Sequence, residues 1–363
     1  MLELEALLQE AERCGASDIY LKAGVPAMLR VEGKTFPYSD HILTPEETRV
    51  IAYRLMGDDA RRRQFESTWE MNMAYTLAGV GRFRVNFYQQ RGSVAMVLRR
   101  VKTRVPTLEE LGLPPILAKL AMEERGLVLV TGATGSGKST TIAAMIQHRA
   151  THAPGHILTI EDPVEFLHTD AMSLVSQREI GTDTESYSEA LKHALRQAPD
   201  VILIGEMRDQ ESVKAAIDFA ETGHLVLSTL HSVNANQTVE RVLQFFPVEQ
   251  HLQVLQLIAA NLKAIVSQRL LRRRDGQGRV AAVEVLLATQ RIRDILRAND
   301  LVKLKPAIEQ GAQEGMQTFD QHIFELYHTQ GVVSLEEALT AADSPNDLRL
   351  RIRGLTPGAL VVS

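Results

Sequence analysis

The chain has 363 residues, of which 45% are hydrophobic and 23% charged, and its formal net charge is −5. This length and composition are typical of a globular protein with two domains and exclude a fibrous or disordered chain. The negative balance also disfavours nucleic-acid binding, which depends on neutralising phosphates with lysine and arginine. We therefore expect no nucleic acid among the partners.

Cysteine content indicates a reducing compartment, and hydropathy indicates a chain with no membrane-spanning helix. The single cysteine, Cys14, excludes an internal disulfide and a cysteine-rich zinc site. No apolar run approaches the roughly 18 residues that a membrane-spanning helix needs, and the N-terminal stretch MLELEALLQE is acidic and amphipathic rather than signal-like. The sequence predicts a cytoplasmic protein with no membrane span of its own, so a partner would have to supply any contact with a membrane.

Residues 1–100 predict a mixed α+β domain. An amphipathic helix at the start is followed by short alternating strands, among them 17–21 and 82–87, and the alternation places polar side chains on one face of a sheet. Residues 101–115 hold three prolines around a Leu-Glu-Glu-Leu-Gly turn, which is typical of a linker. We place the domain boundary in this linker.

Residues 116–363 show a different pattern. From residue 126, short apolar strands alternate with helical segments, which is typical of a parallel sheet with helices on both faces. The predicted strands are 127–130, 157–160, 201–204 and 225–230. After about residue 255 the chain reads as mostly helical with one strand at 280–286, and this region is expected to form a helical cap.

One local basic run stands out in the second domain. It consists of Arg269, Arg272, Arg273 and Arg274, and an evident turn at 275–278 follows it. We interpret the run as a solvated surface loop. The alternative interpretation is a contact with nucleic acid.

The strongest motif is GATGSGKST at residues 132–140, which lies between a predicted strand and a predicted helix. Its first eight residues fit the pattern G-x-x-x-x-G-K-[ST] of a P-loop. Glycines let the backbone curl so that successive amides point at phosphate oxygens. The residues expected to bind the phosphates of ATP are Gly132, Ala133, Thr134, Gly135, Ser136, Gly137, Lys138, Ser139 and Thr140.

Two of these side chains have distinct expected roles. Lys138 is expected to reach the terminal phosphates, and Ser139 is placed to bind Mg²⁺. The helix that opens at Lys138 and continues to about Arg149 directs its positive end at the anion. A fortuitous glycine-rich turn is the ordinary alternative.

A carboxylate follows the strand at 201–204. Glu206 stands at the usual place for the second acid of a metal site in a nucleotidase, with Gly205 before it where a second acid is common. A water-bridged contact to Mg²⁺ fits, because this ion keeps several of its waters. The alternative interpretation is an exposed acid at a strand end with no role in a metal site.

Three further acids surround a proline at the end of another strand. Glu161, Asp162 and Glu165 flank Pro163, and the carboxyl ends of parallel strands face the ligand crevice in an open sheet. We favour Glu165 as the base that orients the attacking water, with Glu161 and Asp162 in support. Solvated acids in an ordinary loop are the alternative.

A histidine stands at each end of the strand 225–230. His231 lies at the carboxyl end, where a sensor of the γ-phosphate would sit. His224 begins the same strand, where packing or an ordinary hydrogen bond explains it as well as a supporting role does.

These segments follow one another in the order of a known family. GATGSGKST, ILTIEDPVEF, VILIGEMRD and TGHLVLSTLHSVNANQTVERV resemble the Walker A loop, Asp box, Walker B strand and His box of the secretion ATPase superfamily. The stretch GMQTFDQHIFELY extends the resemblance over most of the chain. Within that superfamily, GEMRD and FAETGHL are most similar to the PilT/PilU family of type IV pilus retraction ATPases.

The resemblance implies a fold and an assembly. The fold is α/β, with an N-terminal PAS-like α+β domain and a C-terminal RecA-like P-loop domain that ends in a helical region. Six chains are then expected to form a ring with nucleotide at the interfaces. In this family a neighbouring N-terminal domain supplies arginines to the nucleotide, and Arg84 and Arg99 match that pattern best, although solvated charge on a strand edge also explains them.

The resemblance also implies a function. The chain is expected to be an Mg²⁺-dependent ATPase motor that powers pilus retraction, and so twitching motility, while a platform protein holds it at the cytoplasmic face of the inner membrane. Hydrolysis would swing each N-terminal domain against its RecA-like domain about a hinge at residues 101–106. A paralogous retraction ATPase is a further candidate partner.

Two departures from the family pattern keep alternatives open. Extension and type II secretion relatives usually carry a four-cysteine insertion, which one cysteine cannot form, so its absence favours retraction. The family's C-terminal AIR-type motif is present only loosely as RIRDILRA, with Arg291 where the family has alanine, and this keeps an accessory PilU-like motor open. A RecA-like nucleic-acid translocase and a nucleotide-gated module without motor activity are the remaining alternatives.

Overall fold

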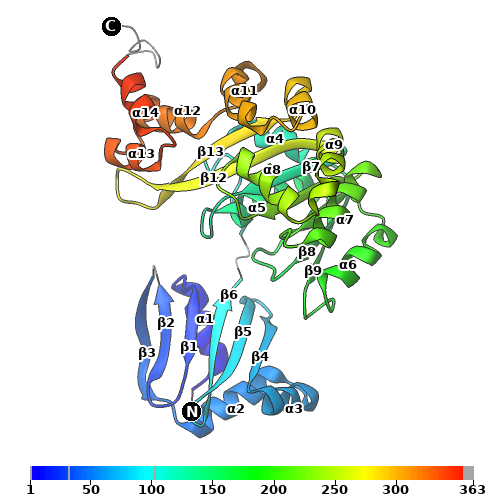
Figure 1. Cartoon of the computed structure of the whole chain (residues 1–363). Coiled ribbons are helices and arrows are strands. Elements are labelled where there is room, and N and C mark those ends of the chain that lie inside the picture. The colour runs from blue at the N-terminus through cyan, green and yellow to red at the C-terminus, as the bar shows by residue number, and fades with distance from the viewer. Residues whose placement is uncertain (1, 32, 102–103, 355–363) are drawn as a thin grey trace. The chain divides into compact units, whose positions relative to one another are not determined.

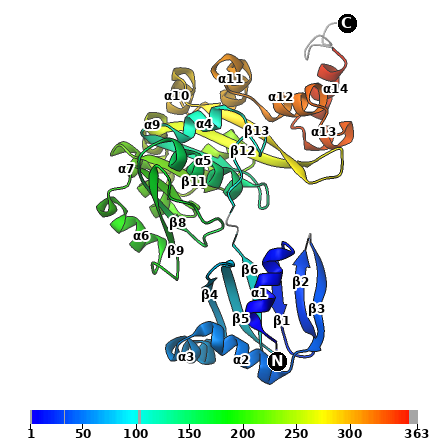
Figure 2. The same ribbon diagram turned by 180° about the vertical axis from the view of Figure 1, so that it is seen from behind.

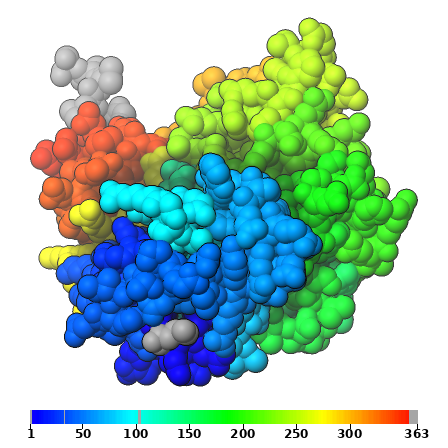
Figure 3. Space-filling model, turned by 90° about the horizontal axis from the view of Figure 1, so that it is seen from below, coloured from blue at the N-terminus to red at the C-terminus, as the bar shows by residue number. Residues whose placement is uncertain are grey.

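The computed structural model describes residues 2–31, 33–101 and 104–354. The chain forms two compact units, one of Met1–Arg104 with Val164–Leu167 and the other of Val105–Pro163 with His168–Ser363. Figures 1 and 2 show the elements of each unit from two sides, and in the space-filling view of Figure 3 the first unit is blue to cyan and the second mainly green to red. Part of the expected hinge, residues 102–103, and the tail 355–363 lie outside the described residues.

The first unit holds, within the described residues, a six-stranded antiparallel sheet in the order β3-β2-β1-β6-β5-β4. The strands are Asp18–Leu21 (β1), Pro26–Val31 (β2), Lys34–Ile42 (β3), Glu70–Leu77 (β4), Gly81–Gln90 (β5) and Ser93–Arg100 (β6). The helices are Leu4–Arg13 (α1), Pro45–Met56 (α2) and Asp59–Thr68 (α3).

The helices of this unit pack on one face of its sheet. Leu4, Leu7 and Leu8 recur at helical spacing and bury one side of α1. They join a core with alternate residues of the strands, such as Phe83 and Val85 of β5. Residues between these, at even-numbered positions of β5, therefore point to the opposite face of the sheet.

The second unit holds, within the described residues, a seven-stranded sheet in the order β13-β12-β7-β11-β10-β8-β9. Its strands are Gly126–Thr131 (β7), Gly155–Glu161 (β8), Ser173–Glu179 (β9), Val201–Ile204 (β10), Leu225–Leu230 (β11), Leu262–Arg272 (β12) and Arg279–Leu287 (β13). All neighbours are parallel except β12 and β13, which form an antiparallel pair.

Both faces of this sheet are covered. The helices are Ile116–Ala121 (α4), Lys138–His152 (α5), Tyr187–Ala194 (α6), Gln210–Glu221 (α7), Ala235–Gln244 (α8), His251–Asn261 (α9), Gln290–Arg297 (α10) and Leu304–Gln310 (α11). Leu127 and Leu129 of β7 pack in one core with α7, α8 and α9, whereas Val128 and Val130 pack in another with α4 and α5. Burial on both faces explains why these strands read as continuous apolar runs.

The C-terminal region forms a smaller cluster of helices against the β12–β13 hairpin. Its helices are Phe319–Phe324 (α12), Leu335–Ala341 (α13) and Pro345–Ile352 (α14), and short 3-10 or π turns lie at Leu195–Gln197, Val248–Gln250, Leu301–Lys303, Ala312–Glu314 and Glu325–Thr329. Leu271, Val280 and Phe319 lie in its core. Across the described residues, we find no helix with the length and apolar character needed to cross a bilayer.

The expected strands of the parallel sheet are confirmed, but two strands were missed. β9 escaped prediction because SLVSQRE is only partly apolar. β12 escaped because it begins directly after helix α9, and no glycine or proline marks the boundary between the two elements. The region after residue 255 is mainly helical, as expected, but it holds two strands, β12 and β13, where the sequence predicted one.

The basic run is also not a surface loop throughout. Arg269 lies within β12, where its guanidinium donates to Asp343 Oδ1 at 2.6 Å and to Ala341 O at 2.7 Å. It also stacks on the ring of Phe319, 3.9 Å from the centroid. Arg269 therefore ties β12 to the C-terminal helices, and only the end of the run lies in the turn.

Candidate nucleotide site

The predicted functional segments follow neighbouring strands of the second sheet. The P-loop follows β7, His231 follows β11, Glu206 follows β10 and Asp162 follows β8, and these strands are adjacent in the order β7-β11-β10-β8. All four are parallel and in register, so the segments emerge at one edge of the sheet. Neighbouring strands lie about 4.8 Å apart, so the segments that follow these four strands are spaced to surround a triphosphate.

The P-loop curls tightly against β12. Gly132 and Gly137 have φ values of 151° and 90°, which favour glycine. A Cβ on Gly132 would lie 2.5 Å from Gln268 O, and one on Gly137 would lie 2.7 Å from Gln268 Nε2. Both glycines are therefore required by the close approach of the loop to Gln268, in addition to any need of a phosphate.

The polar groups of the loop fit an anion. Lys138 is buried, and its Nζ donates to Gly132 O at 2.8 Å and to Ala133 O at 3.0 Å, which draws the ammonium across the loop. Ser136 Oγ is buried and has no hydrogen-bond partner among the described residues. Because buried polar groups are normally satisfied, this hydroxyl is suited to a ligand held by the loop.

Gln268 was missed by sequence reasoning, although it holds the P-loop in place. Its side chain is buried, its Nε2 donates to Ser136 O at 2.8 Å, and its Oε1 accepts from Thr141 Oγ1 at 2.6 Å. One amide thus bridges the loop and the first turn of α5. The signal was weak, because a glutamine in an unrecognised strand does not stand out in a sequence.

Replacing Gln268 with leucine is expected to weaken ATP binding. Leucine fills a similar volume but leaves Ser136 O and the Thr141 hydroxyl without their partners, at a cost of about 1–3 kcal/mol for each group. We expect the dissociation constant for ATP to rise about tenfold or more, measured with a fluorescent ATP analogue. Gln277, in the exposed turn before β13, offers a control: a Gln277→Leu protein with the same weakening would contradict this role for Gln268.

A cluster of charged side chains forms at the ends of β8, β10 and β11. His231 Nε2 lies 3.1 Å from Glu206 Oε1, and Arg208 Nε donates to Glu206 Oε2 at 2.7 Å. Arg208 also donates to Asp162 Oδ2 at 3.1 Å. The structure therefore brings together Glu206, His231 and Asp162, three of the predicted residues, around an arginine that the prediction left out.

Arg208 and Tyr187 are the unpredicted members of this cluster. The bond to Glu206 raises the pKa of Arg208 further, so it stays charged. Burial raises the pKa of the Tyr187 hydroxyl, and the charge of Asp162 adds to the effect, so this group stays protonated. Arg208 could have been found from its position two residues after Glu206 at the same strand end, whereas nothing in the sequence marks Tyr187.

The other two predicted acids, Glu161 and Glu165, have surroundings different from those of Glu206 and Asp162. Glu161 Oε1 accepts from Thr159 Oγ1 at 2.7 Å and from Gln177 Nε2 at 3.2 Å at the end of β8. Glu165 is exposed and lies in Val164–Leu167, the segment that groups with the first unit. Its role as the base stays a prediction.

His224 lies away from the cluster. Its Nδ1 is 3.1 Å from both Phe219 O and Thr222 Oγ1, at the turn between α7 and β11. His231 lies at the opposite end of the same strand, roughly 20 Å away at 3.3 Å per residue. These contacts explain His224 by local hydrogen bonding, and a supporting role stays a prediction.

Arg84 and Arg99 are cross-strand neighbours in the first unit. They pair directly between β5 and β6, and Asp18 pairs in turn with Arg99 and Arg30. Arg99 Nε donates to the buried carboxylate of Asp18 at 2.8 Å. These residues lie on the sheet face opposite the helices, where three arginines and one aspartate leave an excess of positive charge.

Comparison with known proteins agrees with these features. Residues 3–340 match the family described as Type II/IV secretion system protein. The chain is 50% identical over 97% of its length to the Pseudomonas aeruginosa protein "Type IV pilus ATPase PilU", covering 92% of that protein. It is 41% identical over 95% of its length to "Type IV pilus retractation ATPase PilT" of the same organism, all of which is covered.

The chain belongs to the PilT/PilU family of secretion ATPases. A solved structure, "Crystal Structure of the Pilus Retraction Motor PilT and Bound ADP", matches with a TM-score of 0.89 and 42% identity, covering 96% of this chain and 99% of that one. This match confirms the expected fold class, a PAS-like domain and a RecA-like P-loop domain with a helical C-terminal region. The family resemblance drawn from the motifs is likewise confirmed.

Proposed function

We propose that the chain is an ATP-hydrolysing motor of the type IV pilus machinery. The observation that carries the proposal is the meeting of Glu206 with His231 at the sheet edge where the P-loop emerges. An acid and an imidazole beside a P-loop can respond to the presence of a γ-phosphate, which a passive nucleotide-binding module does not need. The same cluster gives no support to the nucleic-acid translocase.

Each residue has a defined task in this proposal. The amides of 132–139 and Lys138 hold the phosphates, Glu165 orients the attacking water, and His231 senses the γ-phosphate from its contact with Glu206. Arg208 holds Glu206 and Asp162 in place through two charge-assisted hydrogen bonds.

Magnesium fits the oxygen donors of the site. Among the described residues, no three His, Cys, Asp or Glu side chains are arranged to hold a metal ion by themselves. A magnesium ion here would therefore rely on substrate phosphates, the Ser139 hydroxyl and, through water, Glu206, which agrees with the preference of this ion for phosphates and a few protein oxygens. When bound, it would neutralise charge on the phosphates.

We further propose a homohexamer in which Arg84 and Arg99 of one subunit act on nucleotide held by its neighbour. The arginines on the sheet face opposite the helices support this proposal, because arginine binds phosphate bidentately and stays charged. A ring explains why these residues lie in a unit separate from the P-loop.

Mixing two inactive variants is expected to restore hydrolysis. Arg84→Ala removes the proposed donated arginine and Glu206→Gln disables the P-loop subunit, but a mixed ring contains interfaces where an intact P-loop meets an intact arginine. We expect the mixture to show ATPase activity well above that of either variant alone. No gain on mixing, with mixed rings verified by native mass spectrometry, would contradict action between subunits. Arg63→Ala, at an exposed position of α3, serves as the control.

The role in the pilus cycle is proposed from the relatives. The identity of 50% to a PilU against 41% to a PilT favours an accessory PilU-like retraction motor. We place it at the cytoplasmic face of the inner membrane, bound to a pilus platform protein, with a paralogous retraction ATPase as second partner. An extension or secretion ATPase is the remaining candidate.

Two experiments test this function. Steady-state hydrolysis by the purified chain should be measurable, and its absence would leave only a nucleotide-gated module. Deleting the gene should leave pili that extend but retract poorly or against less load. A strain that instead lacks pili would point to extension.

A further inference from the structure

The loop after His231 leads directly into α8, and the first turn of α8 rests on a row of buried polar side chains. Glu284 of β13, Ser267 of β12 and Thr131 of β7 are paired in register across three adjacent strands. All three are almost fully buried. Thr131 immediately precedes Gly132, so one end of this row lies at the start of the P-loop.

The helix is fastened to this row at two points. Ala235 N, the first amide of α8, donates to Glu284 Oε1 at 2.8 Å. One turn later, Thr238 Oγ1 lies 3.4 Å from Thr131 Oγ1 and 2.8 Å from Ser232 Oγ. Ser232 follows His231 in the chain, so the contacts that fix the start of α8 also fix the loop that carries the histidine.

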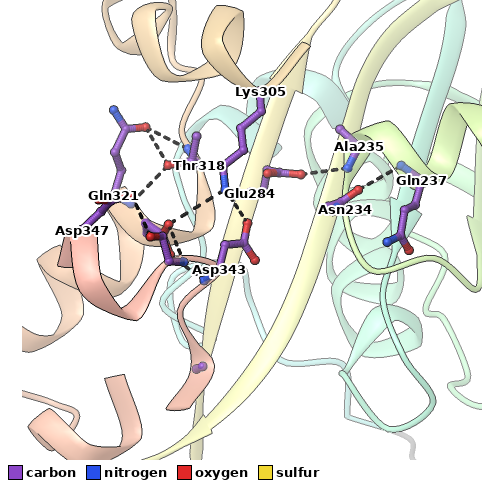
Figure 4. Close-up of polar contacts among 12 residues, drawn as sticks. Asn234, Ala235, Gln237, Glu284, Lys305, Thr318, Gln321, Asp343 and Asp347 are labelled. Carbon is purple, nitrogen blue, oxygen red and sulfur yellow. Dashed lines mark hydrogen bonds and ion pairs between the residues drawn. The ribbon is translucent and has the colours of Figure 1, made fainter. Parts of the chain in front are cut away.

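Glu284 makes an unusual cap for a helix. α8 has a cap of its own, because Asn234 Oδ1 accepts from Gln237 N at 2.9 Å, yet its first amide is bound by a carboxylate from a strand 49 residues further along the chain. Figure 4 shows the side chain pointing from β13 to Ala235, with Lys305 and Asp343 on its other side. A negative charge at this position is favoured by the positive end of the helix.

We propose that Glu284 is a positioning residue for ATP hydrolysis, whose carboxylate anchors the first amide of α8 and so holds His231 against Glu206. The inference rests on the proposed ATPase activity. His231 reaches Glu206 from a loop only a few residues long, so a shift of the start of α8 changes the distance from the histidine to Glu206. Misplacement by about 1 Å can cost about 100-fold in rate.

The ionisation of Glu284 adds a second readout. Burial raises its pKa to about 7, with the charge of Asp343 adding to the rise, while the Ala235 amide, Lys305 and Arg269 act in the opposite direction. The strand partner Ser267 and the facing end of α8 are uncharged, and His322 of α12 contacts Val283 on the other side of β13. Above pH 7 the carboxylate is charged and binds the helix start best, so turnover is expected to fall as the pH drops through 7.

The test compares three variants with the parental protein. Glu284→Met keeps the length of the side chain but offers no acceptor to Ala235 N, so we expect kcat to fall about 10- to 100-fold while KM and ATP affinity change less than about twofold. Glu284→Gln keeps an acceptor oxygen without the charge, as the protonated acid does, so its kcat should lie between those of the parental protein at pH 8 and Glu284→Met, and it should lack the fall as the pH drops through 7. Asp343→Asn breaks contacts with Lys305 and Arg269 but leaves the Ala235 bond, and should keep parental kcat at pH 8.

Several outcomes would overturn the proposal. These are a Glu284→Met protein with parental kcat, an equal loss of kcat in the Met and Gln variants, or a loss of kcat in Asp343→Asn as large as in Glu284→Met.

Hydrogen exchange of the amides at 232–238 gives a test that needs no turnover. The exchange rate should increase in Glu284→Met alone, and an unchanged rate in that variant would contradict the proposed anchoring of α8 by Glu284. A parental protein that binds but never hydrolyses ATP would refute the ATPase proposal itself, and the exchange measurement keeps the two failures apart. A thermal melt identifies a variant that fails to fold, in which case the Gln variant and its pH profile decide.

Discussion

Replacing Lys138 with alanine is expected to abolish ATP hydrolysis and to weaken ATP binding about 10- to 100-fold, the equivalent of one or two charge-assisted hydrogen bonds. The ammonium is buried within the P-loop and bonded to the carbonyls of Gly132 and Ala133, so it lies where the terminal phosphates of a nucleotide would meet it. No other lysine lies in the P-loop motif to replace it. Phosphate release and binding of a fluorescent ATP analogue measure the two effects.

Lys214 provides the matched control for this prediction. It lies exposed on α7 of the same unit, so Lys214→Ala removes an equal charge without touching the loop. We expect it to hydrolyse ATP at the parental rate. If Lys138→Ala also kept that rate, the P-loop would not be the hydrolytic site.

Replacing Glu206 with glutamine is expected to separate binding from hydrolysis. Glutamine keeps the shape of the side chain but loses the charge that pairs with His231 and Arg208. Removing an electrostatic contact made in the transition state typically costs about 10²-fold or more in kcat, whereas the P-loop contacts that bind ATP remain. We expect hydrolysis to drop by orders of magnitude with ATP affinity nearly unchanged.

A charge-matched variant checks the specificity of this effect. Glu211→Gln changes an exposed acid in the first turn of α7 and should retain parental turnover. Parental turnover in Glu206→Gln would remove this residue from the mechanism, and a joint loss of binding and hydrolysis would assign it to nucleotide binding instead.

The parts of the fold that could be predicted were those with a local signal. β7, β10 and β11 read as continuous apolar runs because both faces of their sheet are buried. The P-loop is recognisable because its tight turn requires backbone conformations that favour glycine, and these glycines lie close together in the sequence. β12 gave no such signal, since it begins directly after α9 with no glycine or proline between the two elements.

The candidate site was predictable where residues follow strand ends and not where they act across the sheet. Glu206 and His231 could be placed together because parallel strands end at one edge. Gln268 and Glu284 lie far from the motifs in sequence and reach the P-loop and α8 only through the pairing of β12 with β7 and β13. Arg269 was misread for the same reason, because its partner Asp343 lies 74 residues away.

The decisive measurement for this site is a structure of the purified chain with Mg²⁺ and a non-hydrolysable ATP analogue. We expect the β- and γ-phosphates to be held by the amides of residues 132–139 and by Lys138, with Glu206 and His231 facing the γ-phosphate. A nucleotide bound elsewhere, or a γ-phosphate that faces away from Glu206 and His231, would contradict it.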